Sequence, residues 1–218
     1  MDFDLSVYLV TDTNLCHEAG VEHTVEEAIQ GGVSMVQLRD KLASDEAMIE
    51  LARRLKEALD DHSELTGRYV PLIINDRLNV ALESGADGLH VGQSDTAVHD
   101  ARKAMGEEAI IGLSITNAEQ LADAPLELLD YVGFGPVFAT QSKADHSAPI
   151  GFDGLAALVR ACPMPGVAIG GVKAEHAEAI KQSGAEGMAV VSAICGQPSP
   201  REAARALAKR WQAAPEAP

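Results

Sequence analysis

Two kinds of segment alternate along the whole chain. Short apolar runs rich in β-branched residues have the length of strands buried on both faces, and the stretches between them carry apolar residues at helical spacing. The runs predict strands at residues 7–10, 35–38, 71–74, 88–91, 110–113, 131–134, 167–169 and 188–191. The stretches predict helices at residues 25–30, 45–59, 77–84, 97–105, 117–122, 152–160, 174–183 and 200–213. The pattern therefore predicts eight strand–helix units in succession.

A glycine-containing sequence recurs where three of the predicted helices lead into a strand. Gly31, Gly85 and Gly184 stand where a left-handed residue commonly ends a helix. Eight such units without a break in composition predict an α/β protein, a single (β/α)8 TIM barrel. An open doubly wound sheet is the alternative, but its glycine fingerprint GxGxxG is missing after the first predicted strand. We expect one domain over residues 1–218, with a short disordered tail at 212–218.

The charge of the chain limits its partners. Seventeen Lys and Arg residues against 33 Asp and Glu residues give a formal net charge of −16. A protein that binds nucleic acid or an anionic membrane surface needs a basic face, so the charge argues against both kinds of partner. We therefore look for small molecules as partners; no oligomeric state is predicted from the sequence.

The three cysteines, Cys16, Cys162 and Cys195, are far apart and show no CxxC spacing. They indicate neither a disulfide framework nor a cysteine zinc site. The amino terminus lacks the basic region of a secretion signal, and no apolar run approaches the roughly 18 residues of a membrane span. We therefore predict a cytoplasmic protein.

Candidate chemistry is expected after the strands, because active sites of (β/α)8 barrels lie at the carboxyl ends of their strands. After the second predicted strand, Gln37, Arg39 and Lys41 alternate and should point to one side. An amide and two cations there predict an anion site for phosphate or pyrophosphate. The alternative is a solvated loop in which the cations pair with Asp40 and Asp45.

Two aspartates follow neighbouring predicted strands. Asp76 and Asp95, beside Asn75 and Gln93, would face a bound polyanion, and Mg²⁺ commonly takes one or two carboxylates plus phosphate oxygens. Each aspartate is also in a position to cap a helix, and either of them could serve as a catalytic base. The sequence therefore predicts a magnesium site here, with helix capping as the simpler alternative.

Small polar residues and glycines follow the fifth, seventh and eighth predicted strands. Ser114 has no His and Asp partners evident in the sequence, so we interpret it as a hydrogen-bonding residue and not as a triad nucleophile. Gly170, Gly171 and Ser192 stand where the last two strands of this fold often form a phosphate site.

The longest predicted loop spans residues 135–151. Long loops in compact domains are commonly functional. Thr140, Ser142 and Lys143 supply two hydroxyls and one cation for oxyanion recognition. A loop of this length is also a candidate lid over the active site. His146 is available as an acid or base, although a single loop histidine more often lies at the surface.

Eight short motifs occur in order over nearly the whole chain. They are YLVTD (8–12), QLRDK (37–41), IND (74–76), HVGQSD (90–95), GLS (112–114), GPVFAT (135–140), IGG (169–171) and VSAI (191–194). Together they resemble the thiamine phosphate synthase family. The resemblance implies a (β/α)8 barrel that joins a hydroxymethylpyrimidine diphosphate to a thiazole ethyl phosphate, with or without a carboxylate, and releases pyrophosphate with the help of Mg²⁺.

The resemblance also implies roles for individual residues. The pyrimidine diphosphate would be held by Gln37, Leu38, Arg39, Asp40, Lys41, Asn75, Ser114 and Lys143. The thiazole phosphate would be held by Thr140, Gln141, Ser142, Gly171, Val191 and Ser192. Asp76 and Asp95 would bind Mg²⁺, and the groups implied to act in catalysis are Arg39, Lys41, Ser114 and Lys143.

One motif departs from the family pattern, and other functions remain open. The family usually carries Thr-x-Thr-Lys in the long loop, whereas this chain has Ser142 at the second hydroxyl position. A thiazole tautomerase of the same family is one alternative, in which His146 would act. A phosphate-binding isomerase with Asp76 or Asp95 as its base, and a non-catalytic barrel that binds a phosphorylated metabolite, are the others.

Overall fold

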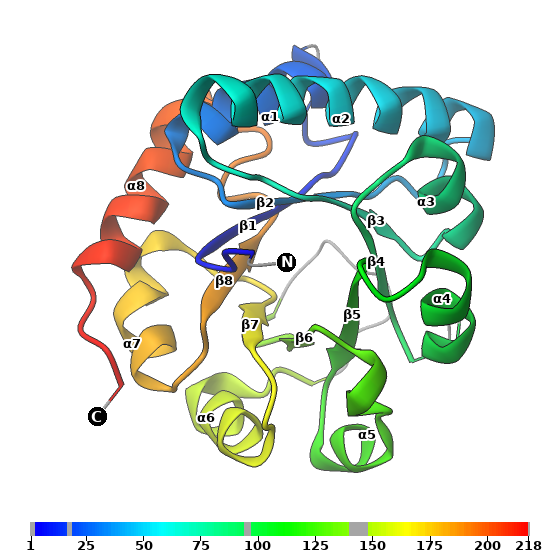
Figure 1. Cartoon of the computed structure of the whole chain (residues 1–218). Coiled ribbons are helices and arrows are strands. Elements are labelled where there is room, and N and C mark those ends of the chain that lie inside the picture. Colours follow the sequence, from blue (N-terminus) through cyan, green and yellow to red (C-terminus); the bar gives the residue numbers. More distant parts are fainter. Residues whose placement is uncertain (1–2, 17–18, 94–96, 140–147, 218) are drawn as a thin grey trace.

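The chain folds into a closed parallel barrel surrounded by helices. The computed structural model describes residues 3–16, 19–93, 97–139 and 148–217. Its strands are β1 (Val7–Val10), β2 (Met35–Leu38), β3 (Leu72–Asn75), β4 (Gly88–Val91), β5 (Ile110–Ile115), β6 (Tyr131–Phe134), β7 (Gly166–Ile169) and β8 (Gly187–Val190). They pair in chain order, and β8 pairs with β1 through Ala189 and Tyr8 to close the ring. The predicted (β/α)8 barrel is confirmed (Figure 1).

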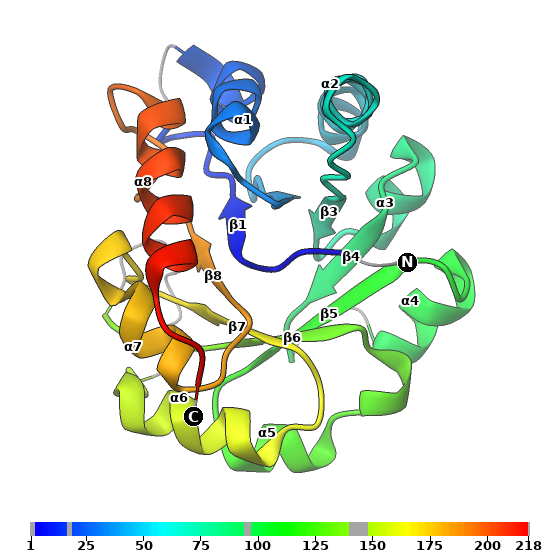
Figure 2. The ribbon, with the colours of Figure 1, turned by 60° about the vertical axis from the view of Figure 1, so that its left-hand side comes forward.

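A helix follows each strand and lies on the outside of the barrel (Figures 1 and 2). The helices are α1 (Gly20–Gly31), α2 (Asp45–Thr66), α3 (Leu78–Ser84), α4 (Val98–Met105), α5 (Ala118–Asp123), α6 (Gly151–Ala161), α7 (Ala177–Gln182) and α8 (Pro200–Ala213). Two 3-10 turns, η2 (Leu126–Leu128) and η3 (Ala174–His176), precede β6 and α7. The helix predicted at residues 174–183 is therefore divided between η3 and α7.

Alternation along the strands separates two cores. In β1, Tyr8 and Val10 point into the barrel with residues such as Met35, whereas Val7 and Leu9 pack against the surrounding helices. Successive side chains of a strand point to opposite faces, so the strands other than β4 contribute apolar residues to both cores. None of the helices in the described part of the chain is both long and apolar enough to cross a membrane.

Glycines end the helices largely as predicted, with one difference. Gly85 and Gly184 have positive φ angles of 75° and 88°. In the first repeat the left-handed residue is Gly32, at φ 111°, and not Gly31. Gly31 is the last residue of α1 and is required for another reason, because a Cβ there would lie 2.3 Å from Arg201 O of α8.

Replacing Gly31 with Ala is expected to destabilise the fold by about 1–3 kcal/mol, because the methyl group would overpack the contact between α1 and α8. Urea denaturation followed by circular dichroism measures the effect. Gln30→Ala, at the exposed neighbouring position, is the matched control and should change stability by less than about 0.5 kcal/mol. Equal stabilities for the two variants would contradict this account of the close approach.

The described part of the carboxyl-terminal tail contacts the rest of the fold, and the disorder expected at residues 212–218 stays a prediction. Ala214 is buried, and the Glu216 carboxylate lies 2.6 Å from Nζ of Lys181 in α7. The segment therefore runs back over α7 after α8 ends (Figure 1).

Candidate active site

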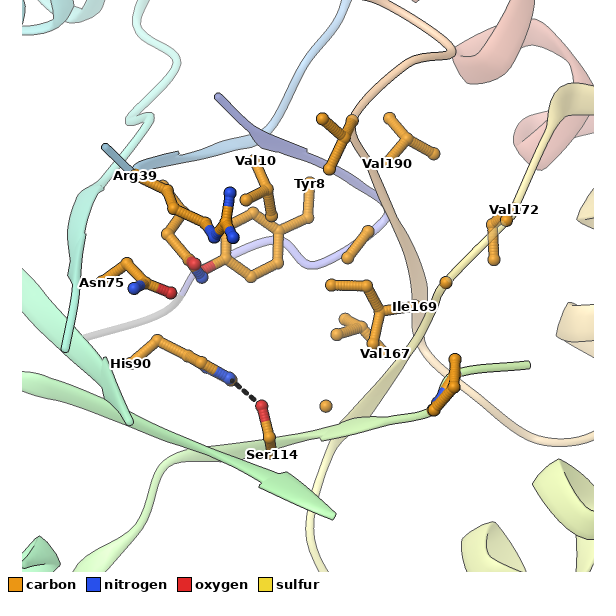
Figure 3. Close-up of a pocket in the computed structure, with 18 of the residues that line it drawn as sticks. Tyr8, Val10, Arg39, Asn75, His90, Ser114, Val167, Ile169, Val172 and Val190 are labelled. Carbon is orange, nitrogen blue, oxygen red and sulfur yellow. Dashed lines mark hydrogen bonds between the residues drawn. The ribbon is translucent and has the colours of Figure 1, made fainter. Parts of the chain in front are cut away.

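A cavity of about 160 Å³ opens at the carboxyl ends of the strands. Strands β1 to β5 supply a polar wall, whereas β7 and β8 supply an apolar wall on the other side (Figure 3). The polar lining residues are Tyr8, Gln37, Arg39, Asn75, His90, Ser114 and Thr116, joined by Ser192 from the end of β8. The apolar wall includes Val167, Ile169, Val172, Ala189 and Val191. The cavity therefore suits a ligand with one polar side and one apolar side.

At the end of β2, alternation places Gln37 and Arg39 in the cavity wall, as predicted. The backbone N–H of Arg39 donates to Thr11 Oγ1 at 3.0 Å, and its Nη1 lies 3.7 Å from Asp12 Oδ2. The Leu38 side chain points the opposite way and is fully buried between the barrel and the surrounding helices. It therefore does not reach the cavity. Lys41 is exposed beyond the strand.

Asp40 holds the loop that follows β2. Its Oδ1 accepts hydrogen bonds from the N–H groups of Leu42 and Ala43 at 2.8 and 3.0 Å, and its Oδ2 accepts one from the Thr13 hydroxyl at 2.7 Å. Burial acts to raise the pKa of the Asp40 carboxyl, but these hydrogen bonds and the nearby Arg77 lower it overall. The Asp40 carboxylate is thus committed to the loop.

Arg77 fixes the same loop from the end of β3, and sequence reasoning did not single it out. Its guanidinium donates to the carbonyl oxygens of Ala43 at 2.7 Å and Asp40 at 3.0 Å, and it pairs with Asp45 at 3.0 Å. In the alternative interpretation Arg39 and Lys41 would pair with Asp40 and Asp45. In the described part of the structure it is Arg77 that pairs with Asp45. The sequence offered one indication of its importance, namely that Arg77 directly follows the candidate site residues Asn75 and Asp76.

Asp76 adopts an unusual backbone conformation at the end of β3. Its φ of 65° makes it the one residue other than glycine with positive φ among those described. Its N–H donates to His90 O at 2.9 Å, and Arg77, not Asp76, is the N-cap of α3. The helix-cap alternative is therefore not what the structure shows, and an unfavourable conformation at a site residue points to a functional constraint.

Two residues at this edge, Asn75 and Asp76, carry side-chain oxygen atoms of the kind that bind magnesium. Asn75 lines the cavity beside Asp76, and carboxylate and amide oxygens are ligands that hard cations prefer. Asp95, the second predicted ligand, lies outside the described residues. Among the residues that are described, no three His, Cys, Asp or Glu side chains are grouped to hold a metal ion. The described part of the site thus fits one carboxylate ligand.

Buried polar side chains cross the floor of the cavity. Gln37 Nε2 donates to Tyr8 OH at 2.7 Å, and the Tyr8 and Tyr131 hydroxyls are 2.8 Å apart. Nδ1 of His90 lies 2.8 Å from Tyr131 OH. Nε2 of His90 lies 2.9 Å from Ser114 Oγ (Figure 3). Burial raises the pKa of both tyrosines, so their hydroxyls stay protonated. Sequence reasoning assigned no role to Tyr8, His90 or Tyr131.

Glycine makes room for this floor. A Cβ at Gly112 would lie 2.2 Å from Tyr131 Cζ, and one at Gly133 would lie 3.4 Å from His90 Cε1. These small residues inside buried strands were the available signal, because a glycine within a strand often marks a close approach.

The ends of β7 and β8 form the opposite side of the mouth. Gly170 and Gly171 have φ angles of 94° and 64°, and Gly171 and Ser192 line the cavity. A Cβ at Gly171 would lie 2.8 Å from Phe138 Cβ, while Phe138 N donates to Gly170 O at 3.0 Å. These glycines therefore also let the loop after β6 pack closely. Thr140, Gln141, Ser142 and Lys143 lie outside the described residues, as does His146.

Comparison with known proteins identifies the family. A profile described as thiamine monophosphate synthase matches residues 7–194 of the chain. The chain belongs to the thiamine monophosphate synthase family. A thiamine-phosphate synthase from a Psychrobacter species is 50% identical over 206 residues, which cover 93% of each chain. One from Azorhizobium caulinodans is 50% identical over 205 residues and 94% of each chain.

Solved structures agree with this family. A thiamine phosphate pyrophosphorylase from Pyrococcus furiosus superimposes with a TM-score of 0.83 at 31% identity, covering 95% of this chain and 96% of that one. A (S)-3-O-geranylgeranylglyceryl phosphate synthase from Thermoplasma acidophilum has a TM-score of 0.66 at 15% identity, over 96% of this chain and 93% of that one, and shares the fold. Members named thiamine-phosphate synthase are transferases, and this chain is an enzyme of that family.

In this member of the thiamine monophosphate synthase family, seven of the residues expected at the two substrates line one cavity. Gln37, Arg39, Asn75 and Ser114 line its polar wall. Gly171, Val191 and Ser192 line the opposite wall. Among the described residues, Arg39 is the cation that lines the cavity. Lys143, the cation expected from the long loop, lies outside the described residues.

Proposed function

We propose that the protein joins 4-amino-2-methyl-5-hydroxymethylpyrimidine diphosphate to a thiazole ethyl phosphate, which gives thiamine phosphate and pyrophosphate. Family membership and 50% identity to named thiamine-phosphate synthases support this reaction. The observation that carries it in the structure is the arrangement of two walls around one cavity. Gln37, Arg39 and Asn75 stand on one side, and Gly171 and Ser192 stand on the other.

This arrangement suits a substitution that begins with departure of pyrophosphate. The bond between the benzylic carbon and the diphosphate oxygen breaks, and its electron pair leaves with pyrophosphate. The aminopyrimidine carries the resulting positive charge until the lone pair of the thiazole nitrogen forms the new C–N bond. Holding both partners in one cavity supplies proximity, and no side-chain nucleophile is needed.

The cationic side chains act on the departing group. Arg39, at the polar wall, stabilises negative charge as it develops on pyrophosphate, and we assign the same role to Lys41 and Lys143. The Ser114 hydroxyl lies at the end of β5 and binds the pyrimidine diphosphate in this proposal. Charge stabilisation by preorganised groups commonly contributes a factor of about 10²–10³ per group.

Magnesium is part of the proposal. Asp76, with Asp95 from the loop after β4, would hold the ion, and the left-handed backbone of Asp76 supports a functional role for this residue. When bound, the ion would neutralise charge on the diphosphate oxygens.

The substrates, partners and location complete the proposal. The partners are small phosphorylated molecules, and the thiazole is tested both with and without a carboxylate. A cytoplasmic location stays a prediction.

The decisive experiment mixes the purified protein with both phosphorylated substrates and Mg²⁺. Thiamine phosphate and pyrophosphate are expected in equal amounts, and leaving out either substrate should abolish both products. A protein that only tautomerises the thiazole would give neither product but would alter the thiazole alone. A non-catalytic binding protein would retain ligand and release no pyrophosphate, and an isomerase would exchange protons on a sugar phosphate without metal.

Replacing Lys143 with Ala is expected to lower kcat by about 100-fold and to change the KM for the pyrimidine diphosphate little. The physical reason is that its cation is proposed to stabilise charge that develops only as pyrophosphate departs. Steady-state kinetics with both substrates measures the split. Lys209→Ala, at an exposed position on α8, is the matched control. A rise in KM with unchanged kcat would assign Lys143 to ground-state binding instead.

A further inference from the structure

Five buried or half-buried side chains join opposite parts of the cavity floor in an unbroken series of hydrogen bonds. The series runs from Gln37 on β2 through Tyr8 on β1, Tyr131 on β6 and His90 on β4 to Ser114 on β5. Its four donor–acceptor distances are 2.7, 2.8, 2.8 and 2.9 Å. Tyr8 and Tyr131 are 1% and 0% exposed, and His90 is 7% exposed.

The direction of the series follows from its first member. Gln37 Nε2 is an amide nitrogen and can only donate, so Tyr8 OH accepts from it. The Tyr8 proton then finds its acceptor in Tyr131 OH, because reversing that bond would leave a buried hydroxyl proton without one. By the same argument the Tyr131 proton goes to Nδ1 of His90.

This direction determines which ring nitrogen of His90 carries the proton. If Nδ1 accepts from Tyr131, the proton of the imidazole stands on Nε2 and is donated to Ser114 Oγ. Ser114 Oγ therefore accepts within the series, and its own proton is left to donate toward the cavity that this residue lines. At the other end, the Gln37 nitrogen is turned to Tyr8, which leaves the amide oxygen as an acceptor.

We infer that Tyr8, Tyr131 and His90 are positioning residues, which fix Gln37 as a hydrogen-bond acceptor and Ser114 as a hydrogen-bond donor toward the pyrimidine diphosphate. The inference rests on the proposed function for the identity of this substrate. An aminopyrimidine presents both an N–H donor and ring-nitrogen lone pairs, so it matches an acceptor at one end and a donor at the other. Loss of the series would misplace both contacts, although Tyr131 itself need not touch the substrate.

The protonation state of the ring gives a direct test in the free protein. Two-bond ¹⁵N–¹H correlation spectra of histidine-labelled protein distinguish the two tautomers, and the His90 signals are assigned by their loss in His90→Gln. The wild-type protein is expected to show protonated Nε2 and unprotonated Nδ1, and Tyr131→Phe to show a mixture. A wild-type ring protonated on Nδ1, or a Tyr131→Phe spectrum unchanged from wild type, would overturn the inference.

Kinetics test the consequence for binding. Tyr131→Phe is expected to raise the KM for the pyrimidine diphosphate about tenfold and to leave the KM for the thiazole phosphate unchanged. Tyr69→Phe is the matched control, because the Tyr69 hydroxyl lies near Asp87 and Tyr69 is not among the described residues that line the cavity. Equal changes in the two KM values, or none, would contradict the assignment.

A pair of variants at His90 separates positioning from simple loss of packing. His90→Gln keeps an amide N–H that can donate toward Ser114, whereas His90→Leu keeps bulk and loses the donor. His90→Leu is expected to raise the KM for the pyrimidine diphosphate about tenfold, and His90→Gln should raise it by no more than about half as much. Identical kinetics for the two variants would contradict a hydrogen-bonding role. A wild-type protein that makes no thiamine phosphate would remove the proposed substrate, whereas the tautomer measurement would still test the series itself.

Discussion

Asp76→Ala is expected to lower Mg²⁺-dependent turnover by about 10³-fold or more, while the protein still binds the thiazole phosphate. The reason is that Asp76 is the described carboxylate of the proposed magnesium site, and removing it would leave the diphosphate charge uncompensated as pyrophosphate departs. Turnover is measured over a range of Mg²⁺ concentrations, and thiazole phosphate binding is measured by calorimetry. A higher Mg²⁺ requirement should accompany whatever activity remains.

The controls separate the carboxylate from the backbone it stands on. Asp76→Asn keeps a residue that tolerates a positive φ of 65°, so it should retain stability better than Asp76→Ala and still lose most of the activity. Asp123→Ala removes an exposed carboxylate at the end of α5 and should leave turnover unchanged. Unchanged turnover in Asp76→Asn would remove this carboxylate from the magnesium site.

Arg39→Ala is expected to lower kcat/KM for the pyrimidine diphosphate by about 10²–10³-fold. Its side chain is 11% exposed and lines the cavity, so its charge acts where water is largely excluded. Arg39→Lys should recover part of this loss, because lysine retains the charge but cannot form the planar fork that matches a phosphate. Steady-state kinetics over both substrates measures each variant.

A matched arginine elsewhere tests whether the effect is local. Arg54 pairs with Glu22 on the outside of the barrel and its side chain is 52% exposed, so Arg54→Ala should leave both kinetic constants within about twofold. Because Arg39 also lies beside Asp12, the thermal midpoint of Arg39→Ala must be compared with that of wild type. A loss of activity explained by unfolding at the assay temperature would contradict the role in charge stabilisation.

The strands could be predicted closely because each is a short buried run with its own composition. Four of the eight, β1, β2, β4 and β6, have the predicted first and last residues. Strands β5 and β7 extend beyond their predicted bounds, and β3 and β8 are shifted by one residue. Helix α8 begins and ends as predicted at Pro200 and Ala213. Helix starts were less accurate, since α1 begins at Gly20, five residues before the first apolar position that indicated it. Local periodicity marks the buried face of a helix but not the turns that extend it.

The residues of the candidate site were also predictable only where local geometry decides their position. Alternation in β2 correctly placed Gln37 and Arg39 together, because neighbouring positions on one strand have a fixed geometry. The same argument could not place Lys41, which lies beyond the strand and is exposed. Arg77 was missed because its partners come from the loop after β2 and from Asp45 at the start of α2, which are distant in the sequence.

The sequence by itself determined the barrel, the order of its elements and the end at which the chemistry lies, because these depend on local burial patterns repeated along the chain. Only the tertiary structure decided which side chains meet on the cavity floor. Tyr8 and Tyr131 are 123 positions apart and their hydroxyls are 2.8 Å apart. Such a contact depends on the closure of the ring and on room left by Gly112, and neither follows from any short stretch of sequence.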